Sequence, residues 1–152
     1  MYSVKKLKYC TILALAGVIP VSLLYFSAYF LNYYTLIGPF CSTAALIIAN
    51  PNSNFCNPKN ILGGYFITIF LVIFSANFLN DHNLFVFLII FSLSIFLMSL
   101  IDAFHPSATA VTIVEFFVTN NPDQMTFYAF TSTILMCIFA YFYRIIHKRF
   151  IA

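Results

Sequence analysis

Charge is what this sequence has least of. Only 7% of its 152 residues are Asp, Glu, Lys or Arg, whereas a soluble domain has about a quarter. Hydrophobic residues make up 62% of the chain, and the mean hydropathy is +0.96. This composition excludes an ordinary soluble domain and indicates an integral membrane protein in contact with the lipid bilayer. We expect it in a bacterial inner membrane.

The sequence also lacks the residue patterns of catalysis and metal binding. It has no Trp and four cysteines, which are Cys10, Cys41, Cys56 and Cys137. Their spacing matches no known metal-ligand pattern. No nucleophile with an adjacent base, phosphate-binding loop or haem motif is visible. We therefore expect no enzymatic activity, no metal and no other cofactor.

Basic residues are few and gather near the two ends of the sequence. Apart from Lys59, they are Lys5, Lys6, Lys8, Arg144, Lys148 and Arg149. Lys and Arg beside membrane spans mark the cytoplasmic side, so both termini should be cytoplasmic. No soluble domain presents these charges to a nucleic acid, and we expect no such partner.

Hydrophobic segments follow a repeated order of long, short and long. The long segments are residues 9–31, 61–79, 84–101 and 125–146, and the short ones are 36–49 and 106–119. A crossing needs about 20 residues as a helix, so only the long segments cross comfortably. The sequence predicts a single all-α membrane domain over residues 1–152, with four full transmembrane helices and two short broken half-helices in two similar halves. If the short segments cross, Lys59 lies inside; if they are re-entrant, it lies outside.

Each short segment has a proline near its start, Pro39 or Pro106, followed by small and hydroxyl residues. Proline suits the first turn of a helix, where the free N–H groups and the helix dipole favour an anion. The hydroxyls of Ser42, Thr43, Ser107 and Thr109 could complete such a site. Transporters hold anionic groups at broken helices in this way. The alternative is that these small residues only let helices pack closely.

Ionisable residues stand close to the second short segment. Asp102 precedes His105 by three residues, so the two side chains could meet if the helix continues that far. Ionisable groups at membrane depth are costly, so they usually have a function. This pair could bind an anion or relay a proton. Glu115 is a second candidate proton carrier. The alternative for each is an ordinary helix end at the headgroup level.

A second candidate region lies at the start of the third hydrophobic segment, residues 61–79. Lys59 could attract anions to a mouth of the protein, or serve only as a topological anchor. Asn60 follows it, and the pair Gly63 and Gly64 should allow another backbone to come close.

Two motifs resemble the HPP family of small integral membrane proteins. They are "CSTAALIIANPNSNFCNPKNILGGYF" at residues 41–66 and "FHPSATAV" at 104–111. The resemblance covers about residues 36–115. The residues matching the family pattern are Thr43, Pro51, Pro58, Lys59, Asn60, Gly63, Gly64, His105, Pro106, Ala108, Thr109 and Ala110. The chain departs from the pattern by lacking the second proline of the His-Pro-Pro triplet. It also has Lys59 where Arg is usual and Tyr65 where His is common.

The resemblance implies four transmembrane helices and an anion-transport function, since some members from chloroplasts and cyanobacteria are described as nitrite transporters. We accordingly expect passage of a small inorganic anion, nitrite first, through a homo-oligomer. His105 would donate a hydrogen bond to the anion, with Asp102 orienting the ring. The rival hypothesis is a scaffold or accessory subunit that transports nothing. A membrane enzyme is a third hypothesis, but few polar residues are available to line its pocket.

Overall fold

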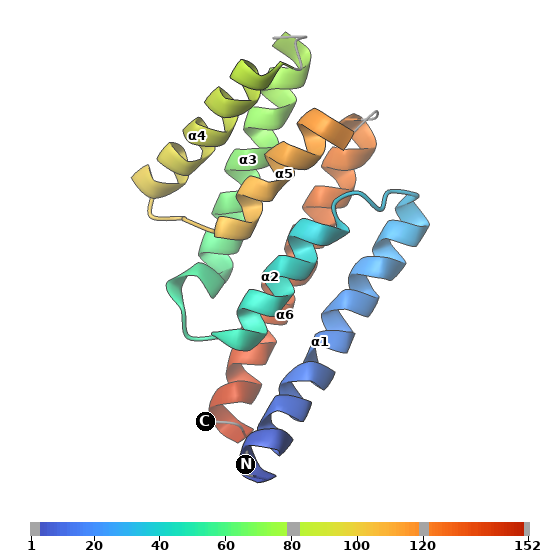
Figure 1. Ribbon diagram of the computed structural model, residues 1–152, viewed down its shortest axis with the longest axis vertical. Helices are drawn as coiled ribbons and strands as arrows, with labels where there is room; N and C mark the ends of the chain where they lie inside the picture. The colour runs from blue at the N-terminus through green and yellow to red at the C-terminus, as the bar shows by residue number, and fades with distance from the viewer. Residues whose placement is uncertain (1–3, 79–82, 119–121, 151–152) are drawn as a thin grey trace.

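The computed structural model describes residues 4–78, 83–118 and 122–150. These residues form six α-helices and one short 3-10 turn (Figure 1). The elements are α1 (Val4–Leu31), α2 (Ile37–Ala49), η1 (Asn54–Cys56), α3 (Pro58–Phe78), α4 (Leu84–Leu100), α5 (Pro106–Val118) and α6 (Pro122–Phe150). The prediction of an all-helical fold is confirmed for these residues.

Three of the helices, α1, α3 and α6, are long and apolar enough to cross a membrane. The fourth expected span, α4, has 17 residues, which is near the lower limit for a crossing. It is shorter than the hydrophobic run because the chain turns at Ile101 and Asp102. The two short helices have 13 residues each. The structure thus has three helices long enough to span a membrane, and the expected arrangement of four full spans and two half-helices is not confirmed.

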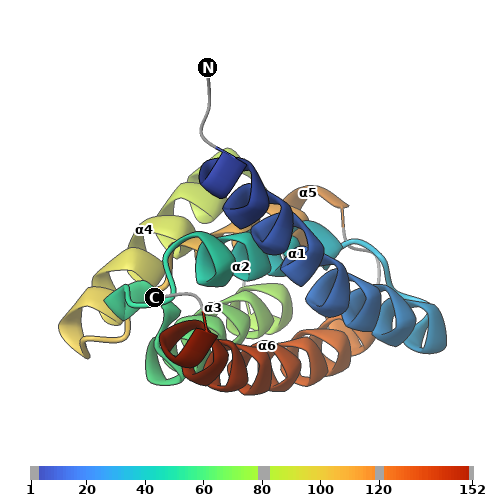
Figure 2. The same cartoon turned by 90° about the horizontal axis from the view of Figure 1, so that it is seen from below.

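The helices alternate in direction along the chain (Figure 1). α1 begins at the lower end of the bundle in Figure 1 and runs upwards, and α2 runs back down. Each later helix reverses direction again, so that α6 ends beside the start of α1. The short helices thus continue towards the opposite end instead of turning back. α3 and α6 lie side by side through the bundle (Figure 2), and α1 and α4 form its two flanks in Figure 1.

The two halves of the chain make equivalent contacts. α1 packs on α2 and α6, and α4 correspondingly packs on α5 and α3. α2 packs on α6 as α5 packs on α3. In addition, α2 packs on α5, its equivalent in the other half, and α3 packs on its equivalent, α6. Exchanging α1, α2 and α3 with α4, α5 and α6 therefore leaves these contacts unchanged. Because α1 and α4 run in opposite directions (Figure 1), the halves form an inverted repeat.

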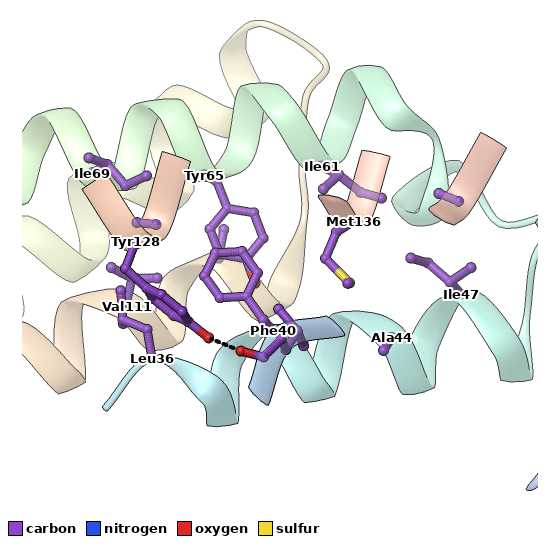
Figure 3. Packing of buried hydrophobic residues seen from close by; sticks show 14 of the residues in the cluster. Leu36, Phe40, Ala44, Ile47, Ile61, Tyr65, Ile69, Val111, Tyr128 and Met136 are labelled. Atoms are coloured by element: carbon purple, nitrogen blue, oxygen red, sulfur yellow. Dashed lines mark hydrogen bonds between the residues drawn. The ribbon is translucent and has the colours of Figure 1, made fainter. Parts of the chain in front are cut away.

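Burial follows the same register in both halves. The buried residues Pro20, Leu24 and Ala28 of α1 match Ile90, Ser94 and Met98 of α4. On the short helices, Pro39, Phe40, Thr43, Ala44 and Ile48 match Ser107, Ala108, Val111, Thr112 and Phe116. On the central helices, Ile61, Gly64, Tyr65, Thr68, Ile69 and Val72 match Met125, Tyr128, Ala129, Ser132, Thr133 and Met136. Figure 3 shows part of the resulting core between α2, α3 and α6. Corresponding helices of the two halves thus bury corresponding positions.

The ends of α1 and α4 are built alike. Asn32 and Asp102 are the two non-glycine residues with positive φ in the described chain, at 50° and 52°. After α1, the Tyr33 amide donates to the Ala28 carbonyl, and after α4, the Ala103 amide donates to the Met98 carbonyl. These bonds form the Schellman motif, which usually has glycine at the left-handed position. Each half therefore ends its first helix with the same turn before its short helix begins.

Candidate functional site

The loop between α4 and α5 lies against α3 at the glycine pair. A Cβ on Gly63 would lie 2.6 Å from the Ala103 Cβ, and a Cβ on Gly64 would lie 2.7 Å from the His105 Cβ. Real Cβ atoms do not approach this closely, so only glycine admits the loop. The expected close approach of another backbone to this pair is confirmed, and its effect is to bury His105 against α3.

His105 is fully buried and both of its ring nitrogens have partners. Nδ1 lies 2.8 Å from the Phe55 carbonyl oxygen, and Nε2 lies 2.9 Å from the Thr43 hydroxyl. Because a carbonyl only accepts, Nδ1 carries the proton and Nε2 of the neutral ring accepts from Thr43.

Thr43 and Tyr65 extend this network into the core. The Tyr65 hydroxyl lies 2.8 Å from the Thr43 hydroxyl and 3.1 Å from the Pro39 carbonyl, and its single proton is shared between these two acceptors. The Tyr65 ring stacks on Phe40, with centroids 4.3 Å apart, as seen in Figure 3. Thr43, Tyr65 and His105 have no exposed surface. Side chains from α2, α3 and the start of α5 thus form one buried polar cluster within an apolar bundle. We call Thr43, Tyr65 and His105 the buried cluster.

Asp102 does not orient His105, so this prediction is wrong. The shared helical face that the prediction required is absent, because α4 ends at Leu100 and Asp102 adopts a left-handed conformation. The Asp102 side chain is exposed, and the His105 ring nitrogens bond to Phe55 and Thr43. The orienting role therefore belongs to a carbonyl from the α2–α3 loop, which the sequence pattern did not single out.

The two short helices overlap at their N-terminal halves. The Ser42 hydroxyl of α2 lies 3.1 Å from the Ser107 hydroxyl of α5. Pro106 is the first residue of α5, as predicted, whereas Pro39 is the third residue of α2. The Thr109 hydroxyl is turned back to the Pro106 carbonyl at 2.7 Å. Ser42, Thr43 and Ser107 therefore come together as expected, and Thr109 bonds within its own helix.

A polar pocket of about 450 Å³ lies beside the buried cluster. It is formed by the α2–α3 loop, the first turn of α3 and the end of α4. Its lining residues are Asn54, Phe55, Asn57, Lys59, Asn60, Ser99, Asp102 and Phe104. Phe55 connects the two regions, because its carbonyl accepts the bond from His105. Lys59, Asn60 and Asp102 thus meet in one place, which we call the Lys59 pocket.

Arg144 fixes the loop that forms one wall of this pocket. Its Nε donates to the Pro51 carbonyl at 2.6 Å, and one terminal nitrogen donates to the Ser53 carbonyl at 2.8 Å. Bonds from a guanidinium are among the stronger protein hydrogen bonds. Sequence reasoning treated Arg144 only as an orientation signal. The one available sign was its position within the apolar part of the last span, away from Lys148 and Arg149.

One expected site residue falls outside the description of the molecule. Glu115 belongs to α5, but its side chain is not among the described residues. Within residues 4–78, 83–118 and 122–150, no three His, Cys, Asp or Glu side chains come together in a way that could hold a metal ion.

A family model described as "HPP, transmembrane region" matches residues 2–150, which is essentially the whole chain. No curated protein and no solved structure matches the chain.

Proposed function

Because this chain belongs to the HPP family of transmembrane proteins, we propose that it carries a small inorganic anion, nitrite first, across a membrane. The resemblance seen in two motifs thus extends over nearly the whole chain. The observation that best supports transport is the buried cluster behind the Lys59 pocket. Polar groups at membrane depth are costly, and they usually belong to an ion or substrate pathway.

The Lys59 pocket is where the anion would first bind. Its donors are the Lys59 ammonium and the side-chain amides of Asn54, Asn57 and Asn60. Such groups replace part of the hydration of an anion. Asp102 shares the pocket, and its charge would limit how tightly the anion is held. Weak binding suits transport, because the ion must also leave.

The basic residues support an orientation with both termini in the cytoplasm. The seven Lys and Arg residues of the chain belong to the beginning of α1, the first turn of α3 and the last turns of α6. These three parts lie towards the same end of the bundle (Figure 1). Under the positive-inside rule this end faces the cytoplasm. The Lys59 pocket would then be the cytoplasmic mouth, and both short helices would cross.

Uptake of nitrite into proteoliposomes tests the proposal. We expect the wild-type protein to take up nitrite and His105→Ala to lose this activity. Lys59→Gln should reduce uptake at low nitrite, because it removes the charge that attracts anions. It should also weaken the dependence of uptake on salt, because salt acts on the wild type by screening this charge. Lys8→Gln, which changes an exposed lysine of α1, is the matched control and should behave as the wild type.

A scaffold or accessory subunit is the second candidate function. It is favoured by the saturation of the buried cluster, in which His105, Thr43 and Tyr65 already bond to one another or to carbonyls. Buried polar networks of this kind can serve only to fix a packing arrangement. Folded protein that takes up no nitrite, chloride or nitrate in the same assay would favour this function. Chemical cross-linking of the membrane-embedded protein would test the proposed homo-oligomer.

A further inference from the structure

The inverted repeat makes two regions at opposite ends of the molecule equivalent. At one end, the start of α3 packs beside α4, and at the other end, the start of α6 packs beside α1. The sequence repeats here as well. "NPKN" at 57–60 leads into α3, and "NPDQ" at 121–124 leads into α6. Asn60 and Gln124 therefore hold equivalent positions, and both carry a side-chain amide.

A pocket occurs at each of these equivalent places. The Lys59 pocket lies between the start of α3, including Asn60, and the end of α4, including Ser99. A second pocket of about 390 Å³ lies between the start of α6 and the end of α1. It is lined by Phe30, Leu31, Gln124 and Phe127, and we call it the Gln124 pocket. The alternation of the helices places the two pockets towards opposite ends of the bundle (Figure 1).

The layers behind the two pockets differ in chemistry. Behind the Lys59 pocket, the α4–α5 loop packs on the glycines of α3, and His105 bonds to Thr43. At the equivalent place behind the Gln124 pocket, the rings of Tyr33 and Tyr128 meet with centroids 5.8 Å apart. Tyr128 also meets Phe40 edge-on at 6.1 Å. The layer behind the Lys59 pocket is thus polar and closely packed against glycine, whereas the layer behind the Gln124 pocket is aromatic.

From this arrangement we propose that the protein is an alternating-access carrier whose two mouths are the Lys59 pocket and the Gln124 pocket. The proposal rests on the proposed transport function. In an inverted repeat, each half can adopt the conformation of the other, which closes one mouth as the other opens. Opening the Lys59 side separates the α4–α5 loop from α3, and opening the Gln124 side separates Tyr33 from Tyr128. The buried cluster and the aromatic layer act as the two gates.

Thiol labelling at the equivalent amide positions tests this proposal. Asn60→Cys and Gln124→Cys would each be made in a Cys10→Ser background, because Cys10 is an exposed native cysteine. A membrane-impermeant maleimide is applied from either side of oriented membranes, with and without nitrite. The Cys10→Ser protein without an added cysteine gives the background. Ser99→Cys and Phe127→Cys, at exposed positions of the same two pockets, replace any variant that fails to fold.

The expected result is labelling of the two positions from opposite sides. Nitrite should raise the labelling rate at one position and lower it at the other, because a ligand that binds one state better shifts the population of both. If nitrite is taken up but the two rates change together or stay constant, alternation is overturned while transport stands. If the two positions label from opposite sides but no nitrite is taken up, the transport function itself fails, and the carrier mechanism fails with it.

Discussion

Substitution of Gly64 by alanine tests whether the site depends on close packing of the α4–α5 loop against α3. The added Cβ would lie 2.7 Å from the His105 Cβ, 3.2 Å from the Met98 sulfur and 3.4 Å from the Ala108 Cβ. The Met98 side chain can move, but the His105 Cβ is fixed by a ring bonded at both nitrogens. Overpacking of this kind destabilises a protein by ~1–3 kcal/mol.

Gly38→Ala is the matched control, because a Cβ at Gly38 would meet no atom within 4 Å. Both glycines lie in helices, where alanine is favoured over glycine by ~1 kcal/mol, so this benefit largely cancels between the two variants. We therefore expect Gly64→Ala to be less stable than Gly38→Ala by ~1–3 kcal/mol. For a protein of this size, each kcal/mol lowers the Tm by ~2–4 °C.

In a Cys10→Ser background, a thiol-reactive dye can follow thermal unfolding in detergent, because Cys56 is buried and reacts only when the structure opens. Gly63→Ala should behave as Gly64→Ala does, since its Cβ would lie 2.6 Å from the Ala103 Cβ. If Gly64→Ala melts at or above the temperature of Gly38→Ala, the loop is free to move aside. The packing argument for the position of His105 would then be wrong.

Two further predictions concern the loop wall and the helix ends. Arg144→Gln removes guanidinium bonds to Pro51 and Ser53, each contributing ~1.5–3 kcal/mol, so hydrogen exchange at the Cys56 and Asn57 amides should accelerate by about tenfold or more. Lys148→Gln, an exposed change in the same helix, should leave exchange unaltered, and equal rates in both variants would show that Arg144 does not hold the loop. At Asn32 and Asp102, where φ is positive, glycine should give a protein more stable than alanine by ~1 kcal/mol. Thermal unfolding of the four variants would measure this, and alanine proving as stable as glycine at either position would argue against the left-handed turn there.

The overall organisation could be predicted because it depends on hydrophobic length and charge. The order of long and short segments follows from the length of each apolar run, and the two halves were visible in that order. The offset between the halves could not be read from the prolines. Pro39 matches Ser107 in burial, not Pro106, because packing against neighbouring helices sets the register of a helix, while proline only restricts where it can begin.

The candidate site was predictable in its residue types but only partly in its contacts. Glycine at Gly64 predicted a close approach because no other residue allows one. Tyr65 was noted only as a departure from the family pattern, although its hydroxyl bonds within the buried cluster. The error over Asp102 arose from assuming a continuous helix, whereas the turn after α4 gives His105 a partner 50 residues away in sequence, the Phe55 carbonyl. Partners that are so distant along the chain depend on tertiary folding, which local spacing does not encode.

The bond between Arg144 and Pro51 joins residues that are 93 positions apart. During synthesis, the ribosome must therefore extend the chain beyond Arg144 before this loop acquires its final anchor. Earlier helices can enter the bilayer one after another, but the wall of the pocket becomes rigid only when the last helix docks. A chain truncated ahead of Arg144 would insert its first helices and still lack a finished entrance.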